Sequence, residues 1–335
     1  MTRTSVLFLL LLVALAARPA QADLVTFDWA LVGNPGNAAA FGVYGGVDYD
    51  YRIGRYEVTN AQYATFLNAV AGTDSFGGVD PALYNPSMGS DARGGITRSG
   101  TPGGYTYATK PNMDSKPVNY VSFIDAMRFT NWLHNGQGSS GTEIGAYTIG
   151  NGLNEVRSAD ARFWVPGQDE WFKAAYHDAS AGTAGAYYQY ATRSNTEPTV
   201  ATVNGVGDIS NPGVNVVNYA GGNGWSNVTT VGSAGLDSAS PYGTFDQNGN
   251  VDEWNEDISS FNSAARITRG GQFNGNFLSL QLGAFSSWAP TTETSIIGFR
   301  VATVPEPSAA MMTAVAAIVA MAAKAASGLT TRQRD

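Results

Sequence analysis

Residues 243–254 read Gly-Thr-Phe-Asp-Gln-Asn-Gly-Asn-Val-Asp-Glu-Trp. Gly243 and Gly249 can adopt the positive φ that a sharply folded loop needs, and Phe245 and Trp254 are expected to fix its ends in a core. The Asp, Asn and Glu side chains between them supply closely spaced oxygen atoms, and calcium binds about six to eight oxygens in flexible geometry. Two interpretations follow: a calcium-binding loop, or a tight turn whose Asp and Asn side chains bond their own backbone. The helix-loop-helix calcium motif is excluded, because the glycine spacing differs and no glutamate stands at the closing position.

The composition indicates a loop-rich globular body. The chain has 335 residues, enough for one large or two small domains with a buried core. Charged residues make up 14% and aromatic residues 11%, with 40 glycines, which is typical of a globular chain fixed by aromatic residues. The net charge is −8 and becomes more negative without the basic residues of the two terminal segments. This charge argues against binding of nucleic acid or an anionic membrane through the folded body, and it is compatible with divalent cations.

The chain contains no cysteine. A disulfide, a thiolate zinc site and a cysteine nucleophile are therefore excluded. His134 and His177 are the two histidines of the sequence, so a catalytic metal held by three histidines is excluded as well.

Residues 1–22 have the features of a secretory signal peptide. Arg3 provides the positive start, residues 6–17 an apolar run, and Ala-Gln-Ala at 20–22 a small-residue cleavage site. An uncleaved membrane helix is the alternative, but the apolar run is short. We therefore expect export, with residues 23–304 as the mature body.

Residues 305–335 form a different kind of segment. Pro-Glu-Pro at 305–307 precedes an uncharged, alanine-rich run at 309–323, and the chain then ends in basic residues. The run is shorter than the roughly 20 apolar residues needed to span a bilayer. A processed sorting tail with transient membrane contact fits this pattern better than a permanent anchor.

Three helices are predicted in the body. Thr59 with Gln62 forms a capping box before a helix that stops at Gly72, and Ser122 with Asp125 forms another before a helix that stops at Gly136. A third helix is expected after Pro166. The inward-facing residues are expected to be Tyr63, Phe66, Leu67 and Val70, then Ala126, Phe129 and Leu133, then Trp171, Ala174 and Ala175.

Two polar features of these helices have ordinary structural explanations. Asp169 and Glu170 begin the third helix, where carboxylates suit the helix dipole. Neighbouring helix positions point about 100° apart, so this pair is not expected to face one another as the acid and base of a glycosidase do, and helix-start carboxylates are the better explanation. His134, at the end of the second helix, is expected on the surface.

The remaining body is expected to hold short strands at 51–58, 266–273 and 297–302. Residues 73–115 and 195–240 are rich in glycine and asparagine and have no sustained period. We interpret them as long irregular excursions of one domain.

These segments, in this order, resemble the formylglycine-generating enzyme (sulfatase-modifying factor) domain family. The matching segments are 56–63, 116–118 with 121–126, 162–171, 243–254, Arg-Gly-Gly at 269–271 and Gly-Phe-Arg-Val at 298–301. They cover residues 51–302, nearly the whole mature body. The tail is similar to the PEP-CTERM sorting signal that exosortase-type enzymes process, although its basic residues are more widely spread.

The resemblance implies an α+β, C-type-lectin-like fold with little regular secondary structure, a few short helices and short antiparallel strands. It also implies calcium at two sets of ligands. The first set is Asp246 and Glu253 by side chain with the carbonyls of Gly249 and Val251. The second set is Asn218 and Asn223 by side chain with the carbonyls of Tyr219 and Trp225.

This sequence departs from the family at several of its functional positions. Asn223 stands where calcium-binding members carry aspartate, and Asp252 replaces a usual tryptophan. Members that make formylglycine hold copper with two cysteines, and the corresponding residues here are Gly275 and Leu280, which offer no soft ligand for Cu(I). The iron-binding histidine set of the related sulfoxide synthases is absent too. We therefore expect no copper and neither of these oxidative reactions.

Three hypotheses for function remain. The first is a non-catalytic, calcium-stabilised binding domain of the cell envelope or extracellular matrix, with a surface glycan, exopolysaccharide or protein as ligand. Its processing partners would be the secretion machinery and an exosortase-type enzyme, without nucleic acid. The second is an enzyme of different chemistry, for example a hydrolase that uses Asp246, Asp252 or Glu253. The third is a purely structural envelope protein.

Overall fold

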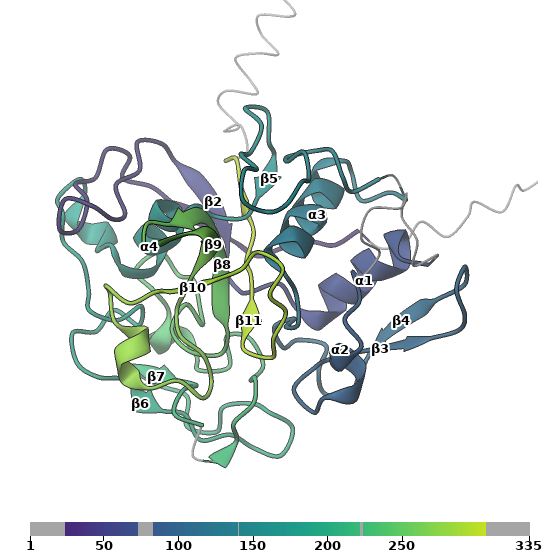
Figure 1. Cartoon of the computed structure of the whole chain (residues 1–335). Helices are drawn as coiled ribbons and strands as arrows, with labels where there is room; N and C mark the ends of the chain where they lie inside the picture. The colour runs from purple at the N-terminus through teal and green to yellow at the C-terminus, as the bar shows by residue number, and fades with distance from the viewer. Residues whose placement is uncertain (1–23, 73–82, 140, 222–223, 306–335) are drawn as a thin grey trace, which may run out of the picture.

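A computed structural model of the chain describes residues 24–72, 83–139, 141–221 and 224–305. It has the expected mixed α+β architecture, with few helices and mostly short strands joined by long loops (Figure 1). The predicted signal peptide lies outside the described residues, as does the predicted tail except for Pro305. Within the described ranges, no helix is both long and apolar enough to cross a membrane.

The three predicted helices are present: α1 (Asn60–Val70), α3 (Phe123–His134) and α4 (Gln168–Tyr176). Both capping boxes form, from Thr59 with Gln62 and from Ser122 with Asp125. Every residue predicted to face inward is buried. One further short helix, α2 (Ser87–Ser90), and the 3-10 turns η1 (Ala179–Ala181), η3 (Leu236–Ser238) and η4 (Phe277–Leu280) were not predicted.

Two four-stranded sheets organise the fold. The first has the order β1 (Trp29–Val32), β2 (Tyr51–Gly54), β12 (Ala302–Thr303) and β5 (Phe163–Trp164). The second has the order β10 (Ser286–Trp288), β9 (Asn262–Arg269), β8 (Asp252–Ser259) and β11 (Ile297–Gly298). The second sheet lies at the centre of the molecule, next to α4 (Figure 1).

The predicted strand boundaries need correction. The strand expected at 51–58 ends at Gly54, where the chain bends toward α1. The strand expected at 266–273 begins earlier and ends at Arg269, because Gly270 and Gly271 both adopt positive φ. The single strand expected at 297–302 is two strands: β11 pairs parallel with β8, and β12 pairs antiparallel with β2 and β5.

Residues 299–301 therefore cross from one sheet to the other. Along this crossing the Phe299 carbonyl accepts a hydrogen bond from the Val58 amide at 2.9 Å, and the Val301 carbonyl accepts one from the Gly54 amide at 2.8 Å. Phe299, Arg300 and Val301 are all fully buried. The crossing places Arg300 between the two sheets.

The irregular regions contain small unpredicted sheets. The described part of the 73–115 excursion includes the hairpin of β3 (Ile96–Ser99) and β4 (Thr106–Thr109), which packs on α1 (Figure 1). The 195–240 region includes β6 (Thr199–Val200) and β7 (Val216–Val217), which pair in parallel. Both excursions belong to the same body as the motifs that flank them.

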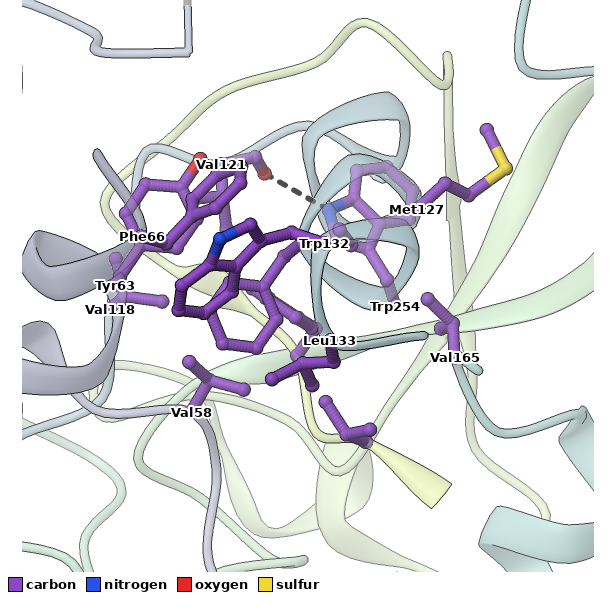
Figure 2. Close-up of a cluster of buried hydrophobic side chains, with 14 of the residues drawn as sticks. Val58, Tyr63, Phe66, Val118, Val121, Met127, Trp132, Leu133, Val165 and Trp254 are labelled. Atoms are coloured by element: carbon purple, nitrogen blue, oxygen red, sulfur yellow. Dashed lines mark hydrogen bonds between the residues drawn. The ribbon is translucent and has the colours of Figure 1, made fainter. Parts of the chain in front are cut away.

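The main core lies between α1, α3 and the two sheets, and its centre is aromatic. Tyr63, Phe66 and Trp132 pack there with Trp254, the last residue of the predicted loop (Figure 2). Trp254 Nε1 donates a hydrogen bond to the Val121 carbonyl at 3.0 Å. Phe245 is buried as well, so both aromatic ends of residues 243–254 are fixed, as predicted.

Candidate functional site

The loop that precedes β8 is folded by four residues of positive φ: Gly243, Asp246, Gly249 and Asn250. A Cβ atom at Gly249 would lie 2.3 Å from the carbonyl oxygen of Asn218, a distance that no side chain tolerates. The Asn250 amide donates a hydrogen bond to that same carbonyl at 2.9 Å. The glycine thus allows the loop to pack directly against the segment of the second predicted calcium set.

The asparagine side chains of the loop bind distant segments. Asn248 Oδ1 accepts a hydrogen bond from the Ala191 amide at 2.8 Å. Asn250 Oδ1 accepts one from the Thr229 amide at 2.9 Å, and its Nδ2 donates to Glu57 Oε1 at 3.1 Å. A self-contained turn does not describe this arrangement, because these side chains join the loop to three other parts of the chain.

Glu253 forms a buried ion pair with Arg300. The Arg300 guanidinium donates to both carboxylate oxygens, with Nη2 to Oε1 at 2.6 Å, and Trp171 Nε1 donates to Oε2 at 2.7 Å. The remaining Arg300 hydrogens reach the carbonyls of Gly54 and Phe245, both at 2.9 Å. Both charged side chains are fully buried, so the pair connects the loop to β2 and α4.

Negative charge exceeds positive charge around this pair. Glu57 and Asp246 interact electrostatically with both Glu253 and Arg300, which makes three carboxyl groups around one guanidinium. Burial raises the pKa of Glu57 well above its usual range, and the charges of Asp246 and Glu253 raise it further. Burial also raises the pKa of Asp246 to about 6, against the lowering effects of the Gly232 amide and Arg300. Without a further cation, burial favours the protonated form of Glu57, whereas Asp246, with its pKa of about 6, is mostly ionised at neutral pH.

The first predicted calcium set provides some, but not all, of its expected ligands for a calcium ion. Asp246 is partly buried, and its Oδ2 accepts a hydrogen bond from the Gly232 amide at 2.6 Å. The fold brings Gly249 and Val251 into the same loop. Glu253, however, is already neutralised by Arg300. Among the described residues, no group of three or more acidic or histidine side chains has the arrangement of a metal site, so an ion here would rely on Asp246 and backbone carbonyls.

The second predicted set contains an oxygen that lacks a partner. Asn218 is buried, and its Nδ2 donates to the Asn227 carbonyl at 3.0 Å. Its Oδ1 is shielded from solvent and has no hydrogen-bond partner among the described residues. A buried oxygen without a partner is costly unless a cation or water contacts it, so Asn218 fits a calcium ligand. Tyr219 and Trp225 lie on the same segment, and Asn223 lies outside the described residues.

Gly275 and Leu280, which the family resemblance places at the positions of copper ligands, are ordinary packing residues. Gly275 accepts a hydrogen bond at its carbonyl from the Ala220 amide at 2.8 Å. Leu280 is fully buried in a hydrophobic cluster with Tyr190, Val217 and Tyr219. The fold therefore brings the segment of these positions beside the Asn218 segment, and neither position offers a metal ligand.

Two residues of the polar cluster around Glu253 were not predicted as site residues. They are Arg300 and Glu57, and both lie inside segments that carry the family resemblance. The signal that could have indicated Arg300 is its charge. The arginine of Gly-Phe-Arg-Val lies in a segment expected to be buried, so it needs a carboxylate partner, and the acidic loop offers one.

Comparison with known proteins agrees with this fold. The family model described as FGE-sulfatase, a sulfatase-modifying factor enzyme 1-like domain, matches residues 47–304. The chain is similar to Treponema denticola variable protein 1, at 19% identity and a TM-score of 0.53, covering 85% of this chain and 98% of that one. It is also similar to CarF, at 20% identity and a TM-score of 0.50, covering 84% of this chain and 99% of that one. At these identities the structural similarity concerns the fold alone. No curated protein matches the chain.

Proposed function

We propose, from the premise that this chain belongs to the sulfatase-modifying factor enzyme 1-like domain family, that it is a non-catalytic binding or structural domain stabilised by calcium. It would be exported by the secretion machinery, sorted by an exosortase-type enzyme through residues 305–335, and retained in the cell envelope or extracellular matrix. Its ligand would be a surface glycan or exopolysaccharide.

The non-catalytic assignment is supported by the residues at the two positions where the family resemblance expects copper ligands. Gly275 has no side chain, and Leu280 presents a buried hydrocarbon. Copper would supply oxygen activation in formylglycine formation, and its soft thiolate ligands have no substitute in a chain without cysteine. The two histidines do not replace them. Both ring nitrogens of the buried His177 are bonded, to Tyr242 and Ala184, and Nδ1 of His134 accepts the Arg162 amide at 3.1 Å.

The hydrolase alternative is less well supported. Asp252 and Glu253 are both buried, Glu253 is paired with Arg300, and Asp252 Oδ1 accepts the Gly271 amide at 2.9 Å. A general acid or base must reach the substrate within hydrogen-bond distance or through one water. Of the three carboxyl groups that the sequence suggested for a hydrolase, Asp246 remains as a candidate acid or base, and the calcium proposal assigns it to the metal ion.

The calcium part rests on two features of the cluster. Asn218 supplies a buried oxygen without a partner, with the carbonyls of Tyr219 and Trp225 and the side chain of Asn223 completing the proposed set. Asp246, together with the carbonyls of Gly249 and Val251, supplies a carboxyl group whose charge Arg300 does not fully neutralise. Calcium there would hold the loop and the Asn218 segment together without disulfides.

An assay of formylglycine formation tests the non-catalytic assignment. The full-length protein is incubated with a cysteine-containing peptide, copper and oxygen, and the peptide is followed by mass spectrometry. We expect the peptide thiol to remain unmodified relative to a protein-free control. Copper-dependent conversion of cysteine to formylglycine would overturn the proposal. A pull-down on extracellular polysaccharide, with calcium and then with a chelator, tests the binding role on the same sample.

A further inference from the structure

A mainly apolar hollow lies where the described part of the chain ends. It has a volume of about 450 Å³, and its lining includes small residues between 158 and 161 together with Tyr49, Val156, Trp164, Val304 and Pro305. This volume is typical of pockets that bind small ligands. The hollow therefore has room for a few residues of a peptide, directly beside the last described residues.

The aromatic side chains of the hollow are held in place by polar contacts. Trp164 Nε1 donates to both carboxylate oxygens of Glu170, at 3.2 and 3.0 Å, and the Arg157 guanidinium lies 4.8 Å from the Trp164 ring centroid. The Tyr49 hydroxyl donates to Glu170 Oε1 at 2.7 Å. The hollow is thus built before any occupant arrives, which limits the entropy lost on binding.

The rim of the hollow presents apolar surface to solvent. Val156 is 78% exposed, and Val304 and Tyr49 are each 46% exposed. Single exposed apolar residues are common, but several at one hollow indicate an interaction surface. These three side chains remain open to solvent in the described part of the chain, so the hollow has room for a further apolar segment.

Residues 306–335 continue from this rim. Because Val304 and Pro305 line the hollow, the next residue begins at its edge. A chain spans at most about 3.3–3.6 Å per residue, so Ala-Ala-Met-Met at 309–312 lies within roughly 25 Å of Pro305 in any conformation. Docking of these residues would be intramolecular, with an effective concentration on the order of millimolar.

The composition of this segment suits the hollow. The run 309–323 is uncharged and rich in alanine, with Met311 and Met312 near its start, and methionine adapts to irregular apolar surfaces. Pro305 and Pro307 restrict the backbone before the run, which lowers the entropy lost when the next residues are fixed. Because the run is shorter than a bilayer span, an apolar face of the body is a suitable partner for it in water.

The charge of the rim favours this occupant over a lipid surface. Asp50 lines the hollow, and Asp160 lies between two of its small lining residues; both aspartates are exposed. Their carboxylates repel an anionic membrane surface. The basic residues that follow the apolar run, Lys324, Arg332 and Arg334, are complementary to them.

We propose that the hollow binds the start of this chain's own C-terminal segment, residues 306–312, with Met311 and Met312 against Val156. The contact covers the apolar rim and the first apolar residues of the segment while the protein is in water. A membrane or a processing enzyme must then compete with the hollow for the segment. This inference goes beyond the proposed function, because it involves neither calcium nor an external ligand.

Disulfide trapping in the full-length protein tests the docking, because the chain has no native cysteine. Val156→Cys is combined with Met311→Cys, and the yield under mild oxidation is measured by mass spectrometry. The control pair is Leu31→Cys with Met311→Cys: Leu31 is 58% exposed and lies in the same sheet, two strands from Thr303. A free segment would reach both positions. We expect the first pair to form its disulfide about fivefold or more faster than the control.

Alkylation of a single introduced thiol provides a second measurement. In Val156→Cys, we expect the thiol to react with a maleimide about fivefold or more slowly than when Met311→Asp and Met312→Asp are also present, since charged side chains do not enter an apolar hollow. Position 156 is exposed and the two aspartates lie in the segment, so these changes spare the core. The thiol of Leu31→Cys should react at the same rate with either segment.

Each other result overturns the proposal. Equal trapping of the two cysteine pairs would mean that the segment is not held at the hollow. An alkylation rate at position 156 that does not change with the charged segment would mean that Met311 and Met312 do not cover it. Vesicles of phosphatidylcholine and phosphatidylglycerol are added to the charged-segment variant as well, and protection of position 156 by them would assign the rim to a lipid surface.

Discussion

Arg300 and Glu253 lie 47 residues apart in sequence and form an ion pair in the fully buried space between the two sheets. The crossing of residues 299–301 places the guanidinium there, and the strand β8 places the carboxylate. Because Arg300 also binds the carbonyls of Gly54 and Phe245, a single side chain joins the loop, β2 and β8. The pair is therefore a structural element that holds the loop in place.

Removal of Arg300 should destabilise the fold strongly. Arg300→Met leaves Glu253 as a buried charge without a partner, and breaking such a pair costs about 3–5 kcal/mol. Urea denaturation measures the loss. Arg193→Met, at an exposed arginine, is the control and should cost much less. The double change Arg300→Met with Glu253→Met should recover part of the loss, since no lone charge remains; a double variant less stable than Arg300→Met would contradict this account.

Gly249 should not tolerate a side chain. Its φ of 77° and the 2.3 Å approach of a Cβ to the Asn218 carbonyl both oppose alanine, and the obstacle is backbone that cannot rotate away. Gly249→Ala should lower the free energy of unfolding by about 2 kcal/mol or more. Gly213→Ala, where a Cβ meets nothing within 4 Å, is the matched control. Equal stability of the two variants would show that the loop does not pack on the Asn218 segment in this way.

The stability of the metal-free protein should fall as pH rises from 5 to 8. Burial raises the pKa of Asp252 from 3.8 to about 7, against the Gly271 amide, and burial raises that of Glu256 from 4.5 to about 7. The folded state therefore binds these protons more tightly than the unfolded chain. Their stabilising contribution is complete below about pH 4 and is lost as pH passes through about 7.

Asp252→Asn tests the largest part of this pH dependence. Asparagine keeps an oxygen for the Gly271 amide and carries no charge, so the variant should gain on the order of a few kcal/mol over the parent at pH 8 and little at pH 5. Denaturation curves at the two pH values, with Asp237→Asn as the exposed control, provide the measurement. A variant whose stability falls with pH as steeply as that of the parent would mean that Asp252 is not the responsible group.

Local sequence signals predicted the local parts of the fold. Thr59 and Ser122 each lie three residues from their capping partners, so both helix starts could be read directly from the sequence. The hairpin β3–β4 and the strands β6 and β7 could not, because segments of two to four residues have no period of their own and are held by partners. The break between β11 and β12 was missed for the same reason, since each half pairs with a different sheet.

The candidate site was predicted in part. The resemblance identified the loop and the Asn218 segment, and the fold brings Gly249 against Asn218 at contact distance. The resemblance did not identify Arg300 or Glu57 as neighbours of the loop, because their contacts with the loop join residues that lie far apart in sequence. Asp169 and Glu170 were interpreted as helix-start carboxylates, and Glu170 does accept the Gly167 amide at 2.7 Å in that role.

Calcium-dependent melting of the full-length protein tests the central claim most directly. The protein is stripped with a chelator and melted with and without calcium, with magnesium as the ion control. Calcium at about 100 times its dissociation constant should stabilise the fold by about 2.7 kcal/mol. Asn218→Leu should lose most of this response. Asn119→Leu removes another buried asparagine whose Oδ1 has no partner and should retain the response at lower overall stability. A calcium response that is absent in the parent, or equal in the two variants, would contradict the proposed site.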